Sequence, residues 1–373
     1  MRSRRSPRAA AATPRTSRVF LHIGAPMAGA AHLRECLARH RRRLTRYGVL
    51  YPASHLGHDG GHLDAVLDAL DLSSTTLAPS TGAWERLAET ARDWRRGTVI
   101  VSHELLADAS DAQVARMVGS FGSAEVHVVY ATRSLARQLP LAWQEWVHNG
   151  GTAPFAAYAN KVVSRDPHRM SKVFWASHDS DEVLRRWSRL VPPDRVHVLT
   201  VADGEDQDGV LWERFARTVG LDPGRFRISR DPRHSLLGLA GNEVLRLLNV
   251  ESEQHPDPRG IERVRRALGS ADGPAPALSD VHADWVRGET DRQVSALKNG
   301  GYDVVGDVTD LLPQQDEFAI RPDQVTPPVG DVVAAQTRAL ATLAGVVDTR
   351  EGPAGLRRRA LRWLSGLSRP TRR

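Results

Sequence analysis

The segment Val19-Phe-Leu-His-Ile-Gly-Ala-Pro-Met-Ala-Gly-Ala-Ala-His32 runs from an apolar, β-rich stretch through a turn of Gly and Pro into a helix-like stretch. In such a turn, backbone N–H groups converge at the start of a helix, where unpaired amides and the helix dipole favour an anion. The pattern predicts a phosphate-binding loop at residues 24–31. Strand-to-helix turns of parallel sheets look similar, so on these residues alone a purely structural turn is the alternative.

Further β-rich runs alternate with helix-like segments along the chain. The runs are Val19 to Ile23, Thr98 to Ser102, Val126 to Ala131 and Val196 to Val201, and the helical segments include Ala30 to Arg46, Glu85 to Arg95 and Ser235 to Asn249. This alternation predicts an α/β fold with a parallel central sheet flanked by helices. In the first helix, Cys36 lies beside Leu33 and Leu37, so a small buried side chain is expected there.

Composition limits the class of protein. Hydrophobic residues make up 41% of the 373 residues, which is enough for a substantial core. No apolar run approaches the roughly 18 residues of a membrane span, and the run Ala9 to Ala12 is too short for a signal-peptide core. The single cysteine excludes an intrachain disulfide. These features predict a cytoplasmic location.

The net charge of +7 comes from the two ends of the chain. Residues 1–18 hold six arginines and residues 354–373 hold seven, and neither segment contains Asp or Glu. The residues between them carry more acidic than basic side chains, so no nucleic-acid partner is expected.

The composition divides the chain into four predicted segments. Residues 1–17 are a disordered basic arm, residues 18–313 the main domain, residues 314–353 a variable linker with a helix at Asp331 to Val346, and residues 354–373 a basic amphipathic tail. The tail sets an apolar stripe against arginines, as a helix lying on an anionic membrane surface does. Peripheral membrane contact and a solvated basic tail are both open readings.

Several phrases within residues 18–313 resemble bacterial sulfotransferases. The loop is similar to that family's strand, Gly-Thr-Pro-Lys-Thr-Gly-Thr-Thr, helix, and further similar phrases are Arg39 to Pro52, Val99 to Glu104, Val126 to Trp143, Val183 to Trp187, Leu211 to Asp222, Ser235 to Asn249 and Gly301 to Pro313. The resemblance implies a P-loop sulfotransferase-like fold. It also implies transfer of a sulfuryl group from 3'-phosphoadenosine 5'-phosphosulfate to a hydroxyl or amine of a small-molecule or carbohydrate-like acceptor, without a metal.

The loop departs from the family's pattern at the Lys and hydroxyl positions, whose side chains take part in the reaction. In the family, the loop holds the 5'-phosphosulfate, its Lys stabilises charge on the bridging oxygen, and its hydroxyls supplement the backbone donors. The matched positions are Gly24, Pro26 and Gly29; Met27 replaces the Lys, and the hydroxyl positions hold Ala25, Ala28, Ala30 and Ala31. Loss of one preorganised donor costs roughly 2.7–4 kcal/mol of transition-state stabilisation, so a backbone site with weakened catalysis is expected.

A second nucleotide contact is implied after the run Val126 to Ala131. The segment Thr132 to Trp143 resembles the family's 3'-phosphate segment, in which an Arg and a later Ser hold the phosphate. Arg133 matches the Arg, whereas Leu141 stands at the Ser position. The alternative for Arg133 is a surface charge at a strand end. The candidates for a cation that replaces the loop Lys are Arg133, Arg137 and Lys172.

His103 and Glu104 follow the run Thr98 to Ser102, at the edge where open α/β sheets place ligand chemistry. Either side chain has the chemistry of a general base, and His is suited to neutral pH. The resemblance favours Glu104. The alternative is that these residues only cap the strand or the next helix.

Other candidate residues are interpreted structurally. His55, His58 and His62 lie in Gly-rich sequence without a recognised ligand spacing, so no metal site is expected. The tryptophans are expected to pack in the core rather than line an acceptor pocket, and those considered are Trp143, Trp146, Trp175 and Trp187.

Two functions are consistent with the sequence. One is an active sulfotransferase with a rebuilt donor site, and the other is a catalytically inactive sulfotransferase-fold protein, a pseudoenzyme that serves as a binding or scaffold partner. A P-loop kinase or ATPase is disfavoured, because no Gly-Lys-Ser/Thr ends the loop to hold Mg²⁺ and the β- and γ-phosphates.

Overall fold

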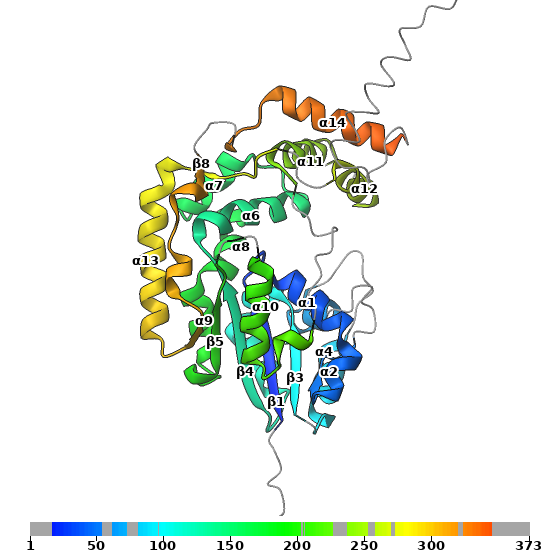
Figure 1. Cartoon of the computed structure of the whole chain (residues 1–373), viewed down its shortest axis with the longest axis vertical. Coiled ribbons are helices and arrows are strands. Elements are labelled where there is room, and N and C mark those ends of the chain that lie inside the picture. Colours follow the sequence, from blue (N-terminus) through cyan, green and yellow to red (C-terminus); the bar gives the residue numbers. More distant parts are fainter. Residues whose placement is uncertain are drawn as a thin grey trace, which may run out of the picture. The chain divides into compact units, whose positions relative to one another are not determined.

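The computed structural model describes most of the chain (Figure 1). The described residues are 17–53, 62–72, 81–95, 97–202, 204, 206–226, 237–252, 258–269, 273–319 and 324–344. The predicted basic tail, and the predicted N-terminal arm up to residue 16, lie outside them. No described helix is both long enough and apolar enough to cross a membrane.

Six strands form one sheet in which every pair is parallel. The order is β2-β3-β1-β4-β5-β7, with β1 Arg18–Gly24, β2 Val49–Leu50, β3 Thr98–Ser102, β4 Glu125–Thr132, β5 Val196–Thr200 and β7 Asp303–Val305. The predicted α/β fold with a parallel central sheet is therefore confirmed, and so are the four predicted strands. The short edge strands β2 and β7 were not predicted.

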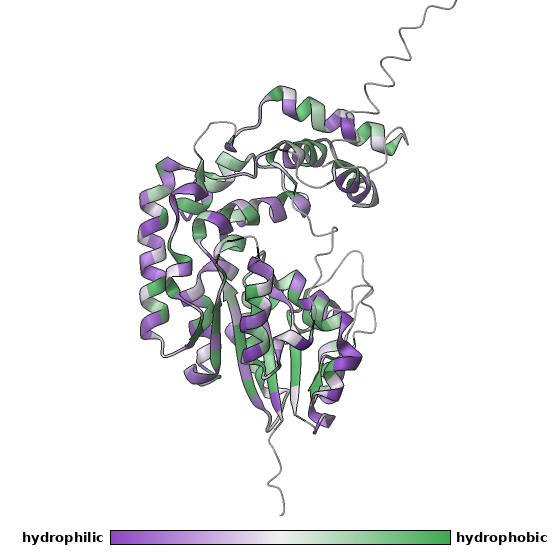
Figure 2. Ribbon diagram, in the orientation of Figure 1, coloured by the Kyte–Doolittle hydropathy of each residue, from purple (hydrophilic) through white to green (hydrophobic). Residues whose placement is uncertain are grey.

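The central strands are apolar because both faces of the sheet are covered (Figure 2). All residues of β3 and β5 are buried, as are all residues of β1 except Arg18. Near-continuous runs of Val, Ile and Leu are typical of strands enclosed on both faces. Because β1 lies between β3 and β4, the chain changes direction at β1, and open α/β sheets bind ligands at the carboxyl ends of such strands.

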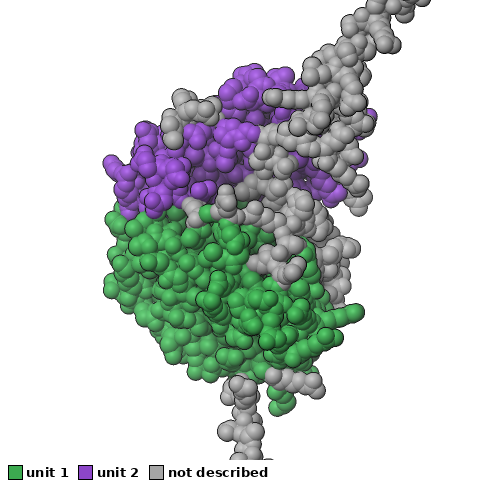
Figure 3. All heavy atoms as spheres, viewed as in Figure 1, with its two compact units in different colours: residues 1–134, 173–229, 288–312 green, residues 135–172, 230–287, 313–373 purple. Residues whose placement is uncertain are grey.

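The chain divides into two compact units whose segments alternate along the sequence (Figure 3). Unit 1 comprises residues 1–134, 173–229 and 288–312, and unit 2 comprises residues 135–172, 230–287 and 313–373. The whole six-stranded sheet belongs to unit 1. The sequence predicted a main domain over residues 18–313. The two units are defined by long-range packing, which local composition does not report.

Helices of unit 1 lie along this sheet. They are α1 Ala30–Arg39, α2 Arg41–Arg46, α3 Leu63–Ala69, α4 Ala83–Asp93, α5 Asp111–Gly119, α9 Ser180–Ser188 and α10 Gln207–Thr218, with residues 173–178 of α8 Arg169–His178 and residues 288–299 of α13 Ala283–Asn299. The helix predicted at 30–46 is two helices that meet at His40, whose ring packs edge-on against Phe226. Cys36, Trp175 and Trp187 are buried as predicted.

Unit 2 is mainly helical. Its helices are α6 Leu135–His148, α7 Phe155–Val163, α11 Leu239–Ser252, α12 Pro258–Leu268 and α14 Val329–Leu343, beside a two-stranded parallel sheet of β6 Leu278–Ser279 and β8 Phe318–Ala319. Trp143 is fully buried against Phe155, as predicted, whereas Trp146 is only partly buried. Ala335 of α14 packs on Ala240 and Val244 of α11, so the helix of the predicted linker is attached to this unit.

Candidate functional site

Three segments predicted to bind the donor or carry the base lie at the carboxyl edge of the unit 1 sheet. The loop 24–31 follows β1, His103 and Glu104 follow β3, and Arg133 follows β4. Because β1 pairs with both β3 and β4, the segments that follow these strands are neighbours in space. The structure therefore brings the predicted loop, the predicted base and the predicted phosphate-binding Arg to one edge.

The loop is anchored on both sides. Ala25 donates its backbone N–H to the Ala131 carbonyl of β4 at 2.5 Å. On the other side, a Cβ atom at Gly24 would lie 3.1 Å from the Cα of Glu104. At Gly29 the φ angle is +88°, and a Cβ atom would come within 2.3 Å of Leu211 in α10. Glycine is therefore required at position 29 both by the left-handed backbone and by the close approach of α10.

Met27 stores backbone strain at the tip of the loop. Its φ of 60° lies in the left-handed region, which costs a non-glycine residue roughly 1–2 kcal/mol. Such strained residues persist where the surrounding structure holds them, and they concentrate at ligand-binding sites. The strain thus marks the position at which the resembled family has its Lys.

The start of α1 is open. Gly29 occupies the N-cap position without a side-chain cap, and no acidic residue is present in the first turn. Among the described residues, the amides of Met27, Gly29, Ala30 and Ala31 donate to no other backbone group. Unpaired amides at a helix start, together with the helix dipole, attract an anion. The loop has the backbone features of a phosphate cradle.

The loop positions at which the resembled family has hydroxyls differ in how deeply they are buried. Ala25, Ala28 and Ala30 are at most 2% exposed, whereas Met27 and Ala31 are partly exposed. A hydroxyl at any of the three buried positions would point into packed protein in this conformation. Of the loop positions at which the resembled family has Lys or a hydroxyl, Met27 and Ala31 are the two that solvent reaches.

Glu104 forms an ion pair with Arg34 of α1. The Arg34 side chain is 16% exposed and the Glu104 side chain 22% exposed, while the two paired atoms, Arg34 Nη1 and Glu104 Oε2, are themselves buried. Arg34 was not among the residues predicted to form the site. The structure nevertheless makes Arg34 a cation adjoining the loop, because Glu104 packs directly over Gly24.

His103 is held in a structural role. Its Nδ1 accepts the backbone N–H of Leu105 at 3.3 Å and so caps the 3-10 helix η1 Glu104–Asp108. Burial, aided by the positive charge of Arg34, keeps the pKa of His103 well below its ordinary value. At pH 7 His103 is neutral and its Nδ1 is already paired. Of the two predicted bases, Glu104 has the more accessible proton acceptor.

Two further histidines, His22 and His62, contact Ser102 of β3, and His22 was not predicted to have a role. His22 Nδ1 is 2.7 Å from Ser102 Oγ. His62 accepts the Ser102 N–H at 3.1 Å and donates to the Pro52 carbonyl at 3.2 Å. Burial lowers the pKa of His22 to about 3 and that of His62 to about 4. Both side chains are neutral and enclosed, so they support β1 and β3.

The two hydrogen bonds of His62 also concern whether the histidines of residues 55–62 could bind a metal ion. His62 uses both ring nitrogens within the protein, while His55 and His58 lie outside the described residues. No cluster of His, Cys, Asp and Glu with the geometry of a metal site occurs in the part of the chain that the structure describes.

The loop has a further contact at Pro26. The buried ring of His178 lies near the Pro26 backbone and stacks on Phe174 with ring centroids 4.4 Å apart, and its Nδ1 is 2.8 Å from the Phe174 carbonyl. Burial lowers the pKa of His178 to about 4, against the opposing effect of nearby backbone carbonyls. A neutral histidine therefore packs beside Pro26.

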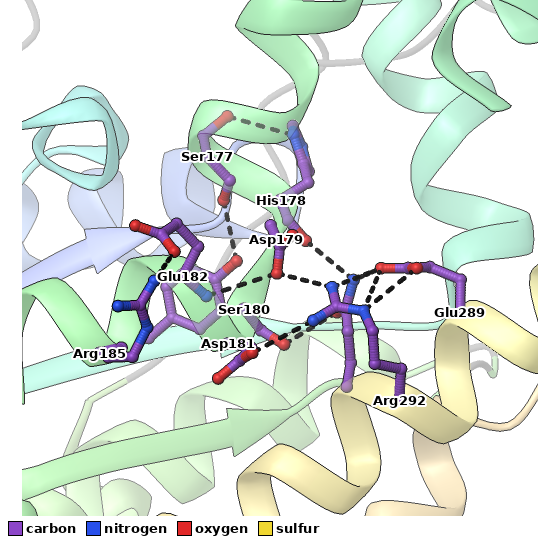
Figure 4. Close-up of polar contacts among 11 residues, drawn as sticks. Ser177, His178, Asp179, Ser180, Asp181, Glu182, Arg185, Glu289 and Arg292 are labelled. Atoms are coloured by element: carbon purple, nitrogen blue, oxygen red, sulfur yellow. Dashed lines mark hydrogen bonds and ion pairs between the residues drawn. The ribbon is translucent and has the colours of Figure 1, made fainter. Parts of the chain in front are cut away.

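The residue after His178 begins a charged network (Figure 4). Asp179 is the N-cap of α9 and binds Arg292 of α13 at 2.8 Å. Arg292 also pairs with Glu289 at 2.6 Å and Asp181 at 3.2 Å. The network fixes the start of α9, and through His178 it supports the loop.

Arg133 is only 8% exposed and is flanked by the buried Thr132 and Ser134. An Arg at this depth, directly after β4, differs from an ordinary exposed charge at a strand end. The other two candidate replacements for the loop Lys, Arg137 and Lys172, belong to unit 2.

Comparisons with protein-family models, with curated proteins and with solved structures find no match for this chain.

Proposed function

We propose that this protein binds 3'-phosphoadenosine 5'-phosphosulfate at the open start of α1 and transfers its sulfuryl group to a hydroxyl or amine of a small-molecule or carbohydrate-like acceptor. The observation that carries the proposal is the set of unpaired amides at Met27, Gly29, Ala30 and Ala31, next to the Arg133 segment.

Donor binding relies on groups that this chain has kept. Backbone amides do not depend on side-chain identity, so the alanines of the loop leave them in place. Arg133 supplies a planar, permanently charged group suited to the 3'-phosphate. A hydrogen bond to a charged group contributes about 1.5–3 kcal/mol, so these contacts together are sufficient for a nucleotide with two anionic ends.

Transfer would use the ion pair beside the loop. An arriving phosphosulfate competes with Glu104 for Arg34, because both are anions. Arg34 then offsets the charge that grows on the bridging oxygen as its bond to sulfur breaks. The freed carboxylate of Glu104 accepts the acceptor's proton as the new bond to sulfur forms. The products are the sulfated acceptor and 3'-phosphoadenosine 5'-phosphate.

The second candidate is an inactive member of the same fold that binds a nucleotide or another anion without transfer. The observation in its favour is Met27, which puts an uncharged side chain at the tip of the loop. Loss of one preorganised donor lowers the rate by roughly 10²–10³. Arg34 is the residue whose contribution separates the two candidates.

As part of the same proposal, the protein acts in the cytoplasm, with its basic tail in contact with an anionic membrane surface.

Calorimetric titration with 3'-phosphoadenosine 5'-phosphate tests donor binding. Wild-type protein is expected to bind in the micromolar range. Arg133→Ala is expected to weaken binding about 10- to 150-fold, which corresponds to one lost charge-assisted contact, and Arg133→Lys to weaken it less. Absence of binding at millimolar nucleotide would overturn the proposal.

Transfer is tested by following labelled donor with a panel of hydroxyl and amine acceptors. An active enzyme loses turnover in Arg34→Ala and Glu104→Gln while both variants still bind the nucleotide product. Nucleotide binding without a sulfated product from any acceptor would select the inactive candidate instead.

A further inference from the structure

Four titratable side chains of unit 1 form a hydrogen-bonded network across strands β4, β5 and β7. Glu125 Oε1 lies 2.8 Å from His127 Nε2. His127 Nδ1 lies 2.9 Å from His197 Nε2, and His197 Nδ1 lies 2.6 Å from Asp303 Oδ2. Glu125 and Asp303 are the first residues of β4 and β7. This histidine network is therefore at the opposite end of the strands from the loop 24–31, and neither candidate function uses it.

The two rings are shielded, whereas the two carboxylates reach solvent. The side chains of His127 and His197 are 11% and 10% exposed, and those of Glu125 and Asp303 are 33% and 51% exposed. Phe20 of β1 stacks on both rings, with centroid distances of 4.5 Å and 5.8 Å. The planes of the two rings differ by only 10°, and their facing nitrogens are in hydrogen-bond contact.

The number of ring protons decides the charge of the network. Each of the three contacts needs one proton between its two heavy atoms. Ionised carboxylates only accept, so all three protons must come from the two rings. Two neutral imidazoles carry two N–H protons, whereas one imidazole and one imidazolium carry three. All three contacts are hydrogen bonds only if the two rings together hold one extra proton.

We propose that His127 and His197 share one extra proton at neutral pH, that His197 carries it as an imidazolium, and that this charge holds the edge strand β7 on β5. His197 then donates from Nε2 to His127 and from Nδ1 to Asp303. His127 is neutral and donates from Nε2 to Glu125.

Two observations place the charge on His197. Its contact with Asp303 is the shortest of the three, and charge-assisted hydrogen bonds are short. Burial lowers the pKa of His127 against the opposing hydrogen bond to Glu125, and the positive charge of His197 adds to the lowering. A neutral His127 beside a charged His197 agrees with both.

The charged groups around the two rings favour the extra proton. Glu125 of β4 and Asp303 of β7 contact the rings directly. Arg18 of β1 lies over Phe20, 5.8 Å from the centroid of its ring, and Arg195 of η2 Pro193–Arg195 pairs with Glu125 at 3.5 Å. The hydrogen bond from His127 lowers the pKa of Glu125, and Arg195 also lowers it, so Glu125 is ionised. Two carboxylates in contact with the rings stabilise a cation more than the two more distant guanidinium groups oppose it.

Loss of the extra proton breaks one contact. With two ring protons, either His197 Nδ1 and Asp303 Oδ2 face each other as acceptors, or His127 Nδ1 and His197 Nε2 do. Strand β7 has three residues and lies at the edge of the sheet, paired with β5, so it is the strand that can move away. Since the intact contact holds the proton, β7 is held at lower pH and loosens as the pH rises through the value at which the rings release it.

The segment after β7 has a second attachment that contains no histidine. Asp310 of η6 Val308–Leu311 accepts hydrogen bonds from Thr200 Oγ1 at 2.6 Å and from Arg214 Nη1 at 2.8 Å. Thr200 belongs to β5 and Arg214 to α10. Neither a hydroxyl nor a guanidinium changes its charge near neutral pH. A substitution at Asp310 is therefore the matched control for one at Asp303.

Nitrogen-15 NMR of the full chain with labelled histidine counts the ring protons, with signals assigned by their loss in His127→Gln and His197→Gln. At pH 7.5, about one unit above the ordinary histidine value, His197 is expected to have two protonated nitrogens and His127 only Nε2–H. Asp303→Asn is expected to shift the titration of His197 down by about one pH unit or more, and Asp310→Asn to leave it in place. Two neutral rings in the wild type at pH 7.5 overturn the proposal, and so does an extra proton that Asp303→Asn does not shift.

Amide hydrogen exchange measures whether the proton holds β7. After correction for the intrinsic rise of exchange with pH, protection of residues 303–305 in the wild type is expected to fall about tenfold or more between pH 7 and pH 9.5. Asp303→Asn should remove this dependence on pH, and Asp310→Asn should keep it. Constant protection in the wild type, a dependence that Asp303→Asn retains, or its equal loss in both variants overturns the proposal.

Discussion

The N-termini of α1 and α9 differ in whether a side chain accepts a hydrogen bond from their first backbone amides. At α9, Asp179 accepts the N–H of Glu182, two acids occupy the first turn, and Arg292 balances the charge (Figure 4). At α1, Gly29 provides no cap and the first turn has no acid. A Gly at the N-cap costs a helix only a few tenths of a kcal/mol relative to a capping side chain. The open start of α1 is therefore available to the anion that we propose to bind there.

The two helix starts are physically linked. His178 lies near the Pro26 backbone in the loop before α1, and it directly precedes Asp179 at the start of α9. The closed start is thus adjacent to the loop that precedes the open one. Changes at each start are expected to have different effects on folding and on binding.

Lowering the pH is expected to change the free energy of unfolding most, because buried neutral histidines lie near the starts of both α1 and α9. The folded pKa is about 3 for His22 and about 4 for His62 and His178, below the ordinary 6.5. As pH falls below 6.5, the unfolded chain takes up protons that the folded chain does not. Stability is therefore complete above pH 6.5 and falls toward pH 4, by about 1.4 kcal/mol per pH unit for each histidine.

Urea unfolding at pH 7, 6 and 5 measures this slope. In His22→Asn the slope is expected to be smaller by about 1.4 kcal/mol per pH unit, since one of the titrating groups is gone. A free energy of unfolding that stays constant from pH 7 to pH 5 would contradict the assigned neutral histidines.

Gly29→Ala, at the start of α1, is expected to cause the second-largest loss in the free energy of unfolding. The left-handed backbone costs about 1–2 kcal/mol with an alanine, and the clash with Leu211 adds about 1–3 kcal/mol. The measurement is the free energy of unfolding in urea. Gly150→Ala is the matched control, because Gly150 has a φ of +91° with no atom near its Cβ position. Equal losses at the two sites would show that close packing of α10 on the loop contributes nothing.

At the closed start, Asp179→Ala is expected to lower the free energy of unfolding by about 0.5–2 kcal/mol through loss of the cap. Asp179→Asn keeps a capping oxygen and should lose less. If the Asn variant is as unstable as the Ala variant in thermal unfolding, the pairing with Arg292 and not the cap is what stabilises α9.

Ala31→Glu is expected to cause the smallest change in the free energy of unfolding. The change is informative because its sign should be opposite to that of the change in nucleotide affinity. A carboxylate in the first turn of α1 stabilises the helix dipole by about 0.3–1 kcal/mol, while it repels a phosphate. Stability should rise slightly and nucleotide affinity should fall at least tenfold. Ala31→Gln separates size from charge. If the free energy of unfolding and the nucleotide affinity rise or fall together, the start of α1 does not differ from the start of α9 in binding an anion.

The elements predicted best from sequence are those with strong local patterns. The apolar runs at β1, β3, β4 and β5 could be placed because strands covered on both faces need continuous hydrophobic residues. The two-residue strand β2 is too short to produce a pattern, and the break at His40 depends on packing against Phe226. The alternation of the two units along the chain is likewise a property of distant contacts.

The same limit applies to the site. The loop, Glu104 and Arg133 could be placed at one edge because carboxyl ends of parallel strands meet there. Arg34 could not be found, since a single Arg on a polar helix face resembles any solvated charge until its partner is known. His22 is one polar residue inside an apolar run, and only the fold shows its contact with Ser102.

The most direct test of the central claim is calorimetric titration of wild-type protein and Ala31→Glu with 3'-phosphoadenosine 5'-phosphate under identical conditions. An anion-binding start of α1 predicts micromolar binding by the wild type and at least tenfold weaker binding by the variant. Equal affinities would place the nucleotide elsewhere, and absence of wild-type binding at millimolar concentration would contradict the assignment of this edge as a phosphate site.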